Sequence, residues 1–217
     1  MKTKLALCLV LQAICAVGCV AGETPAETKK QPVFLLCPDR EHYGSWSIYF
    51  VVNKKDPTKP LSLGLEELSG HNKADDGGYG KVLDAQENPS TQRVEIATLD
   101  AKQFGSGALK VEKNSALNVT ITPDGDTYKL VIDLRIEQDK RFNLGGEKSG
   151  ATIILKYNPA FRAWGAYATS LSDHQGKNIV AGEPVRITGL WFPVSATAIS
   201  RIYAVLAGNK SVLVYDR

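Results

Sequence analysis

Cysteine and histidine are scarce in this chain of 217 residues, and their scarcity excludes several kinds of chemistry. Cys8, Cys15 and Cys19 fall within the first 22 residues, which leaves Cys37 as the only cysteine in the remainder. That remainder has no partner for an intrachain disulfide, so its fold depends on burying apolar side chains. Cys37 follows the apolar run 34–36, where a buried thiol packs as a small hydrophobic group. The three histidines show no ligand spacing, so no metal site is predicted.

An excess of charge of one sign is also lacking. The chain has 26 Lys and Arg residues against 23 Asp and Glu residues, and removal of Lys2 and Lys4 leaves 24 against 23. Nucleic-acid binding needs a concentrated basic surface, and anionic lipid attracts polybasic segments. The balance therefore predicts no nucleic-acid partner, and it predicts membrane contact only through a lipid at the N-terminus.

The first 22 residues have the layout of a secretory signal peptide. Lys2 and Lys4 precede an apolar run at 5–20, which Gln12 interrupts, and small residues follow. The run is short for a membrane span, which needs about 20 apolar residues. We therefore predict that residues 1–21 are a signal peptide and that the rest of the chain is extracytoplasmic.

Two cleavage positions compete within this segment. Small residues around Ala21 fit a general signal peptidase, which would release a secreted or periplasmic chain beginning near Gly22. Residues 16–19, Ala-Val-Gly-Cys, resemble a bacterial lipobox, in which Cys19 is lipidated and tethers the protein to a membrane. Both alternatives stay open, and the lack of disulfides suits a bacterial cell envelope.

Behind the signal, the sequence predicts a tether and one domain. Residues 22–32 are polar and carry two prolines, so they are predicted to form a flexible tether. Residues 33–217 are long enough for a single domain, and 43% of the whole chain is hydrophobic, which provides material for a core.

Apolar and polar residues alternate with period two along most of this domain. The alternation predicts about nine or ten strands, and hence an all-β fold, an antiparallel β-sandwich or an open barrel. Three hairpins are predicted, at 116–136 around a Pro-Asp-Gly turn, at 152–169 and at 202–215. Minor helical turns are predicted at 65–68 and 100–104.

Two glycine-rich loops, at 70–80 and 141–150, are candidate binding loops. The first contains Asp75, Asp76 and Tyr79. Adjacent carboxylates on flexible backbone are ligands of the type that Ca²⁺ takes, although Asp-Gly pairs serve mainly as turn residues. Calcium is therefore the one cation considered, and no cofactor is predicted.

Aromatic side chains are the other candidate binding groups. Trp46 and Trp191 lie in apolar runs, where core packing explains them. Trp164 lies among small residues in the segment Arg-Ala-Trp-Gly-Ala-Tyr, which ends at Tyr167. We predict that Trp164, Tyr167, Tyr79, Asp75 and Asp76 contact a ligand.

No catalytic motif accompanies these features. The sequence therefore predicts an exported cell-envelope module that binds a glycan or a protein partner. One alternative is an extracytoplasmic hydrolase that uses scattered acids or a pair of Cys37 with a histidine. The other is a purely structural envelope protein.

Overall fold

The computed structural model describes the chain from Glu27 onward, with gaps. The predicted signal peptide, Cys19, Asp75, Asp76 and Tyr79 lie outside the described residues. The described ranges are 27–38, 45–69, 92–100, 109–113, 117–137, 139–180, 182–193, 198–208 and 210–217.

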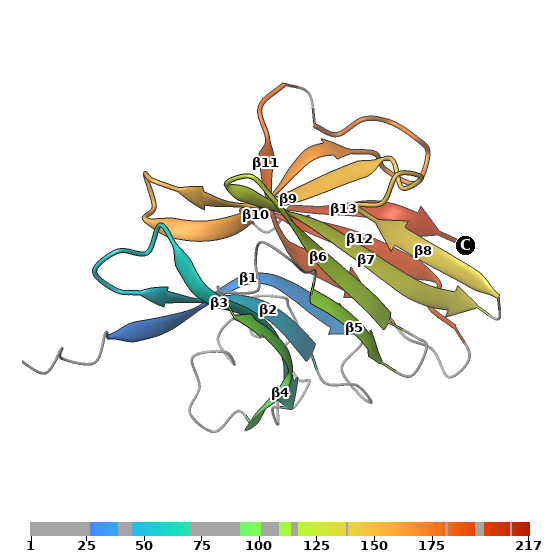
Figure 1. The fold of residues 1–217 in the computed structure, drawn as a ribbon. Helices are drawn as coiled ribbons and strands as arrows, with labels where there is room; N and C mark the ends of the chain where they lie inside the picture. Colours follow the sequence, from blue (N-terminus) through green and yellow to red (C-terminus); the bar gives the residue numbers. More distant parts are fainter. Residues whose placement is uncertain are drawn as a thin grey trace, which may run out of the picture.

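Every regular element in these ranges is a β-strand, and thirteen strands form one sheet (Figure 1). The predicted all-β class is confirmed. In chain order the strands are β1 (Thr28–Pro38), β2 (Ser45–Asn53), β3 (Pro60–Ser69), β4 (Gln92–Asp100), β5 (Leu109–Lys113), β6 (Leu117–Asp124), β7 (Thr127–Glu137), β8 (Lys140–Leu144), β9 (Ala151–Asn158), β10 (Ala163–Leu171), β11 (Val185–Phe192), β12 (Arg201–Leu206) and β13 (Lys210–Asp216).

The sheet curls into a half-barrel, which brings its two edge strands β4 and β5 into contact. Its main path runs in the order β4-β3-β2-β1-β11-β10-β9-β7-β6-β5. The other strands branch from this path: β8 pairs with β7, β12 pairs with β11, and β13 pairs with β12. The sheet is mixed rather than wholly antiparallel, because β1 runs parallel to β11 over residues 35–38 and 189–192.

The branching arises because β7 and β11 each change partner along one edge. On that edge β7 pairs with β9 through residues 128–130 and with β8 from residue 132 onward. Likewise, β11 pairs first with β10 at 185–187 and then with β1. Each change of partner splits the sheet, so the layers diverge and enclose one hydrophobic core.

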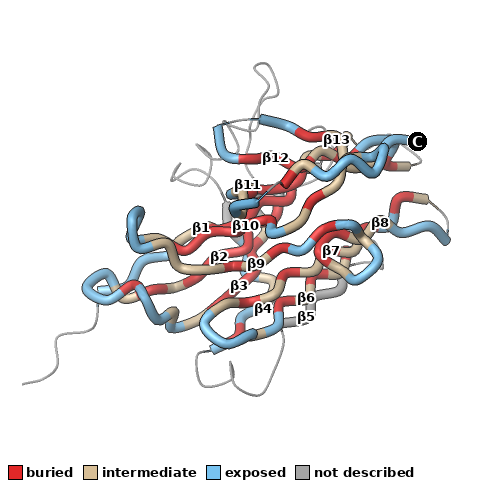
Figure 2. Tube along the Cα trace, turned by 90° about the horizontal axis from the view of Figure 1, so that it is seen from above, coloured by how far each residue is buried: buried red, intermediate tan, exposed pale blue. Residues whose placement is uncertain are grey.

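Alternating burial along the strands supplies that core. In β7 the buried side chains are Tyr128, Leu130, Ile132, Leu134 and Ile136, which are every second residue. Figure 2 shows the same pattern across the molecule, with buried positions inside the strands and exposed positions at the turns. Each fully buried aliphatic side chain contributes about 1.5–3 kcal/mol relative to an exposed one.

The three predicted hairpins are confirmed as β6–β7, β9–β10 and β12–β13. Gly125 adopts φ +58 in the first turn and Gly208 adopts φ +80 in the third, a conformation that favours glycine. Three further strands, β3, β5 and β8, were not predicted from the alternation.

Two of these strands correct specific predictions. The predicted helical turn at 65–68 is wrong, because these residues continue β3 and pair with β2 and β4, which outweighs the helix propensity of Leu and Glu. The predicted loop at 141–150 is also shorter, since its first four residues belong to β8. The second predicted helical turn begins at the last residue of β4, and residues 101–104 lie outside the described ranges.

The predicted tether at 22–32 ends earlier than expected, because β1 begins at Thr28. Residues 28–32 pair with residues 49–53 of β2, and the Lys54 amide donates to the Glu27 carbonyl. Pairing with β2 satisfies the backbone hydrogen-bonding groups of this polar segment. A search for alternating apolar residues does not detect such a strand.

The outer face of β1–β4 carries a partly buried polar cluster. Glu66 is 2% exposed, and its carboxylate accepts from Lys30 Nζ at 2.8 Å. The Tyr49 hydroxyl donates to Glu95 Oε2 at 2.8 Å, and Lys30 Nζ lies 4.2 Å from the centre of the Tyr49 ring. Burial, the bond to Glu95 and the charges of Glu95 and Glu66 raise the pKa of Tyr49. The tyrosine ring packs against Gly64, where an added Cβ would be 2.3 Å from a ring carbon.

Gly64→Ala is expected to destabilise the protein by about 1–3 kcal/mol, since the new methyl group forces the Tyr49 ring to move. In a Tyr49→Ala background the same change should be neutral or stabilising, because alanine suits a strand better than glycine. Urea unfolding of the four members of this cycle measures the coupling. Equal costs in the two backgrounds would contradict the proposed packing.

Candidate functional site

A pocket of about 510 Å³ opens where the β2–β3 and β6–β7 turns meet the β9–β10 hairpin. Backbone pairing positions its walls, because Tyr128 of β7 is the register partner of Leu155 of β9, and Trp164 of β10 is the partner of Tyr157. Its lining residues are Thr58, Lys59, Pro60, Gly125, Asp126, Tyr128, Tyr157 and Trp164.

Aromatic rings form one side of this pocket. The Trp164 ring centre lies 5.8 Å from that of Tyr128 and 5.9 Å from that of Tyr157. Behind it, Phe50 packs 4.8 Å from Trp164 and 5.2 Å from Tyr128. Tilted and edge-on ring pairs of this kind contribute about 0.5–1.5 kcal/mol beyond their burial, so the aromatic wall is rigid.

Trp164 is held at both its backbone and its ring. The indole Nε1 donates to the Pro57 carbonyl at 2.9 Å, and the Trp164 amide donates to Gln31 Oε1 at 3.3 Å. The side chain is 4% exposed, because it packs against the rings of Phe50, Tyr128 and Tyr157. The structure therefore places this predicted ligand contact in the pocket wall, while the half-buried Tyr157 offers more of its ring to a ligand.

Tyr167, the second predicted contact, does not join Trp164. The two residues are three positions apart on β10, so they face opposite sides of the strand. The Tyr167 hydroxyl accepts from Asn158 Nδ2 at 3.0 Å, and Lys156 Nζ lies 4.7 Å from the ring centre. These contacts give Tyr167 a packing role outside the pocket.

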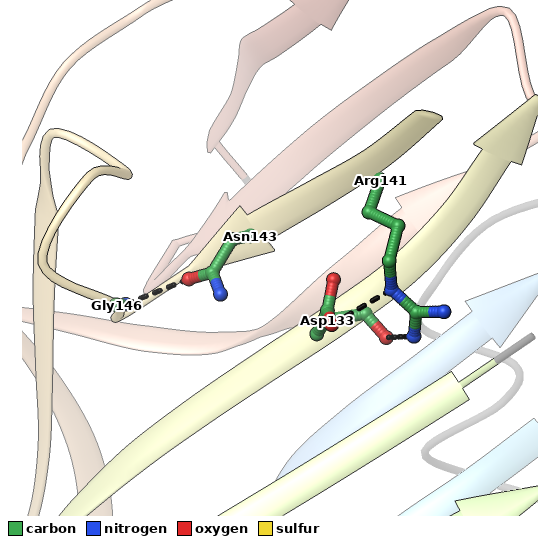
Figure 3. Close-up of polar contacts among 4 residues, drawn as sticks. All are labelled: Asp133, Arg141, Asn143 and Gly146. Carbon is green, nitrogen blue, oxygen red and sulfur yellow. Dashed lines mark hydrogen bonds and ion pairs between the residues drawn. The ribbon is translucent and has the colours of Figure 1, made fainter. Parts of the chain in front are cut away.

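The segment 141–150, the second predicted binding loop, is held by bonds to β7 and by bonds within itself. Arg141 Nε donates to Asp133 Oδ2 at 2.8 Å, and Asn143 Oδ1 accepts from the Gly146 amide at 2.9 Å (Figure 3). The Ser149 hydroxyl donates to the Gly146 carbonyl. A shallow depression of about 270 Å³ lies beside Arg141, but the arginine is engaged with Asp133.

Sequence reasoning did not select Tyr128, Lys59 or Asp126 as site residues. Tyr128 directly follows a turn and shares the alternation of a core strand, so the pattern predicts burial alone. Lys59 and Asp126 lie in two turns more than 60 positions apart, and nothing in the sequence pairs those turns. The only sequence feature that Tyr128, Lys59 and Asp126 share is a position in or next to a predicted or actual turn.

The electrostatics of the pocket separate a neutral interior from a charged rim. Burial raises the pKa of Tyr128 to about 12, so its hydroxyl stays protonated at neutral pH. Lys59 and Asp126 are exposed at the rim. Hydrogen bonds from the Thr58 hydroxyl and amide lower the pKa of Asp56, which keeps that neighbouring carboxylate charged. The arrangement suits recognition of a ligand with an apolar face and a hydroxylated edge.

Within the ranges that the structure describes, no three His, Cys, Asp or Glu side chains gather into a group that could hold a metal ion. The same ranges hold no helix that is long and apolar enough to cross a membrane. Comparison with protein-family models, with curated proteins and with solved structures finds no match to this chain.

Alkaline pH is expected to weaken the fold through Tyr128. The pKa of its hydroxyl is raised from 10.0 to about 12, so its contribution is complete below pH 10 and is lost as the pH rises to about 12. The full loss is at most about 3 kcal/mol. Tyrosinate absorbance and urea unfolding against pH test this, with Tyr128→Phe removing the late-titrating group. The same titration midpoint in folded and unfolded protein would contradict it.

Proposed function

We propose that this chain is an exported binding protein of the bacterial cell envelope and that it takes a glycan in the aromatic pocket. The observation that carries the proposal is the wall of Trp164, Tyr128 and Tyr157 beside a polar rim. The volume of about 510 Å³ lies within the range of small-ligand sites.

Sugars match this arrangement because they present both kinds of surface. The C–H face of a sugar ring packs on the exposed part of the Tyr157 ring, and the sugar hydroxyls bond to Lys59, Asp126 and the Tyr128 hydroxyl. Aromatic rings offer a large contact area with little side-chain freedom to lose. A concave site also favours a glycan over a folded protein partner, which needs a larger and flatter surface.

The carboxylates support binding rather than hydrolysis. Hydrolysis of a glycosidic bond by the usual route needs two carboxyl groups on either side of the bond. Among the described lining residues, Asp126 is the only acid. The paired acids Glu66 and Glu95 lie on the outer face of the sheet, where Lys30 and Tyr49 bind them. The binding role therefore ranks above the hydrolase alternative.

The second part of the proposal is a lipid at Cys19. Eight residues, at positions 20–27, separate Cys19 from the first residue of β1. Fully extended, these residues span at most about 30 Å. A lipid at Cys19 would therefore hold the folded sheet closer to the membrane surface than the predicted flexible tether at 22–32 implies.

Calorimetric titration of glycans from the cell wall and the capsule is expected to find a ligand whose affinity falls about tenfold or more in Tyr157→Ala. The reason is the loss of the aromatic surface that the sugar contacts. Tyr203→Ala is the matched control, because Tyr203 is also half-buried and aromatic but stacks on Trp191 outside the pocket. Equal loss in both variants, or no binding by any glycan, would count against the pocket.

Cys19→Ser in the full chain is expected to move the protein from the membrane fraction to the soluble exported fraction. Mass spectrometry of the N-terminal peptide should show an acylated Cys19 in the unchanged protein. An N-terminus near Gly22 in the unchanged protein would show that the general signal peptidase acts instead. That result removes the anchor and leaves the pocket proposal standing.

A further inference from the structure

The β9–β10 hairpin exposes a large apolar side chain at its tip. Phe161 is 68% exposed, more than Val94 at 56% or Leu61 at 41%, the other large apolar side chains exposed in the described ranges. The tip is rigid: the Ala160 amide donates to Asn158 Oδ1 at 3.0 Å, and the Arg162 amide donates to the Pro159 carbonyl at 3.2 Å. Phe161 therefore faces solvent from a fixed position.

The residue after it adopts a costly backbone conformation. Arg162 has φ +46, in the left-handed region that favours glycine. The β6–β7 and β12–β13 turns place Gly125 and Gly208 in this conformation. A side chain there costs about 1–2 kcal/mol. Neither the exposed Phe161 nor the strained Arg162 stabilises the fold. Residues in strained backbone conformations cluster at sites that bind ligands or partners.

The surroundings of this tip are basic. The start of β1, the β2–β3 turn at 54–59 and the β9–β10 turn at 159–162 lie at the same end of the molecule, on the left of Figure 1. We call these three segments the basic end. Its exposed bases are Lys29, Lys54, Lys55, Lys59 and Arg162, against Glu27 and Asp56.

The balanced charge of the whole chain hides this grouping, since only the fold brings the three segments together. Glu27 forms an ion pair with Lys54, so these two charges of the basic end offset each other. The β6–β7 turn borders this end, because its Asp126 lines the pocket together with Lys59. With Asp126 counted, the five exposed bases face three acids.

We propose that the basic end docks on an anionic phospholipid bilayer. Phe161 enters the interface between headgroups and acyl chains, where aromatic side chains are favoured, and Arg162 and Lys55 bind lipid phosphates. Charge complementarity supports this partner. The chain also enters the fold at this end, since Thr28 starts β1 and eight residues, at positions 20–27, separate it from Cys19. The proposal needs neither the glycan nor the lipid at Cys19.

The test uses a chain that begins at Gly22, which carries no lipid and keeps every described strand. It is sedimented with vesicles of phosphatidylcholine alone and of phosphatidylcholine with phosphatidylglycerol. Each base near an anionic surface contributes about 1 kcal/mol, so binding should be at least about tenfold stronger on the anionic vesicles and should weaken with salt.

Two variants separate docking from folding. Phe161→Ser and Arg162→Gly should each weaken vesicle binding about fivefold or more. Arg162→Gly should keep or raise the melting temperature, because glycine relieves the strained φ. Val94→Ser is the control, since it also removes an exposed apolar side chain. Val94 lies on β4 opposite Glu67, near the end of β3 that is far from the β2–β3 turn.

Absence of binding to anionic vesicles, or equal binding by Phe161→Ser and Val94→Ser, overturns the proposal. Glycan affinity gives an independent readout, because Phe161 does not line the pocket. A chain that loses vesicle binding in Phe161→Ser and keeps glycan affinity supports docking. Failure of every glycan to bind leaves the vesicle result unaffected.

Discussion

The structure depends on the pairing of β1 along both of its edges. On one edge β1 pairs with β2, which comes next in the chain, and on the other it runs parallel to β11, about 150 residues later. The contact with β11 covers residues 35–38 only, yet it joins the β1–β4 meander to the later strands. Without it, Phe34, Leu36 and Ile48 would have no opposite layer to pack against. The core, and with it the pocket, therefore depends on this short parallel pairing of β1 with β11.

The aromatic pocket follows from the same arrangement. Where β11 exchanges β10 for β1, the start of β10 separates from β11 and lies beside β1, while it stays paired with β9. Trp164 fills the space between them and links three segments through Gln31, Pro57 and the aromatic cluster. The hairpin that carries Trp164 also carries Phe161 at its tip, so one departure from regular pairing creates a concave wall and a projecting tip.

Much of the fold could be predicted from local patterns, and much of the site could not. Alternation located ten strands, and turn residues such as Gly125 located the hairpins, because both signals act over a few residues. Strand β3 was missed because its leucines and glutamates favour helices, and only its neighbours make it a strand. The pocket was missed because Lys59, Asp126 and Tyr157 meet only through long-range register. Trp164 was selected for its small neighbours in the sequence, but in the structure the rings of Phe50, Tyr128 and Tyr157 bury it.

The parallel seam between β1 and β11 also bears on how the chain reaches its folded state. During synthesis the N-terminal residues emerge first, so β1 and β2 are complete long before residues 189–192 are available. Until then, one edge of β1 presents unpaired amide and carbonyl groups beside the apolar side chains of Val33, Phe34 and Leu35. Such an edge adds strands from other chains readily, and closing a loop of this length is slow. The interval between the arrival of β1 and that of β11 is therefore the time when this protein is most exposed to aggregation and most in need of a holding chaperone.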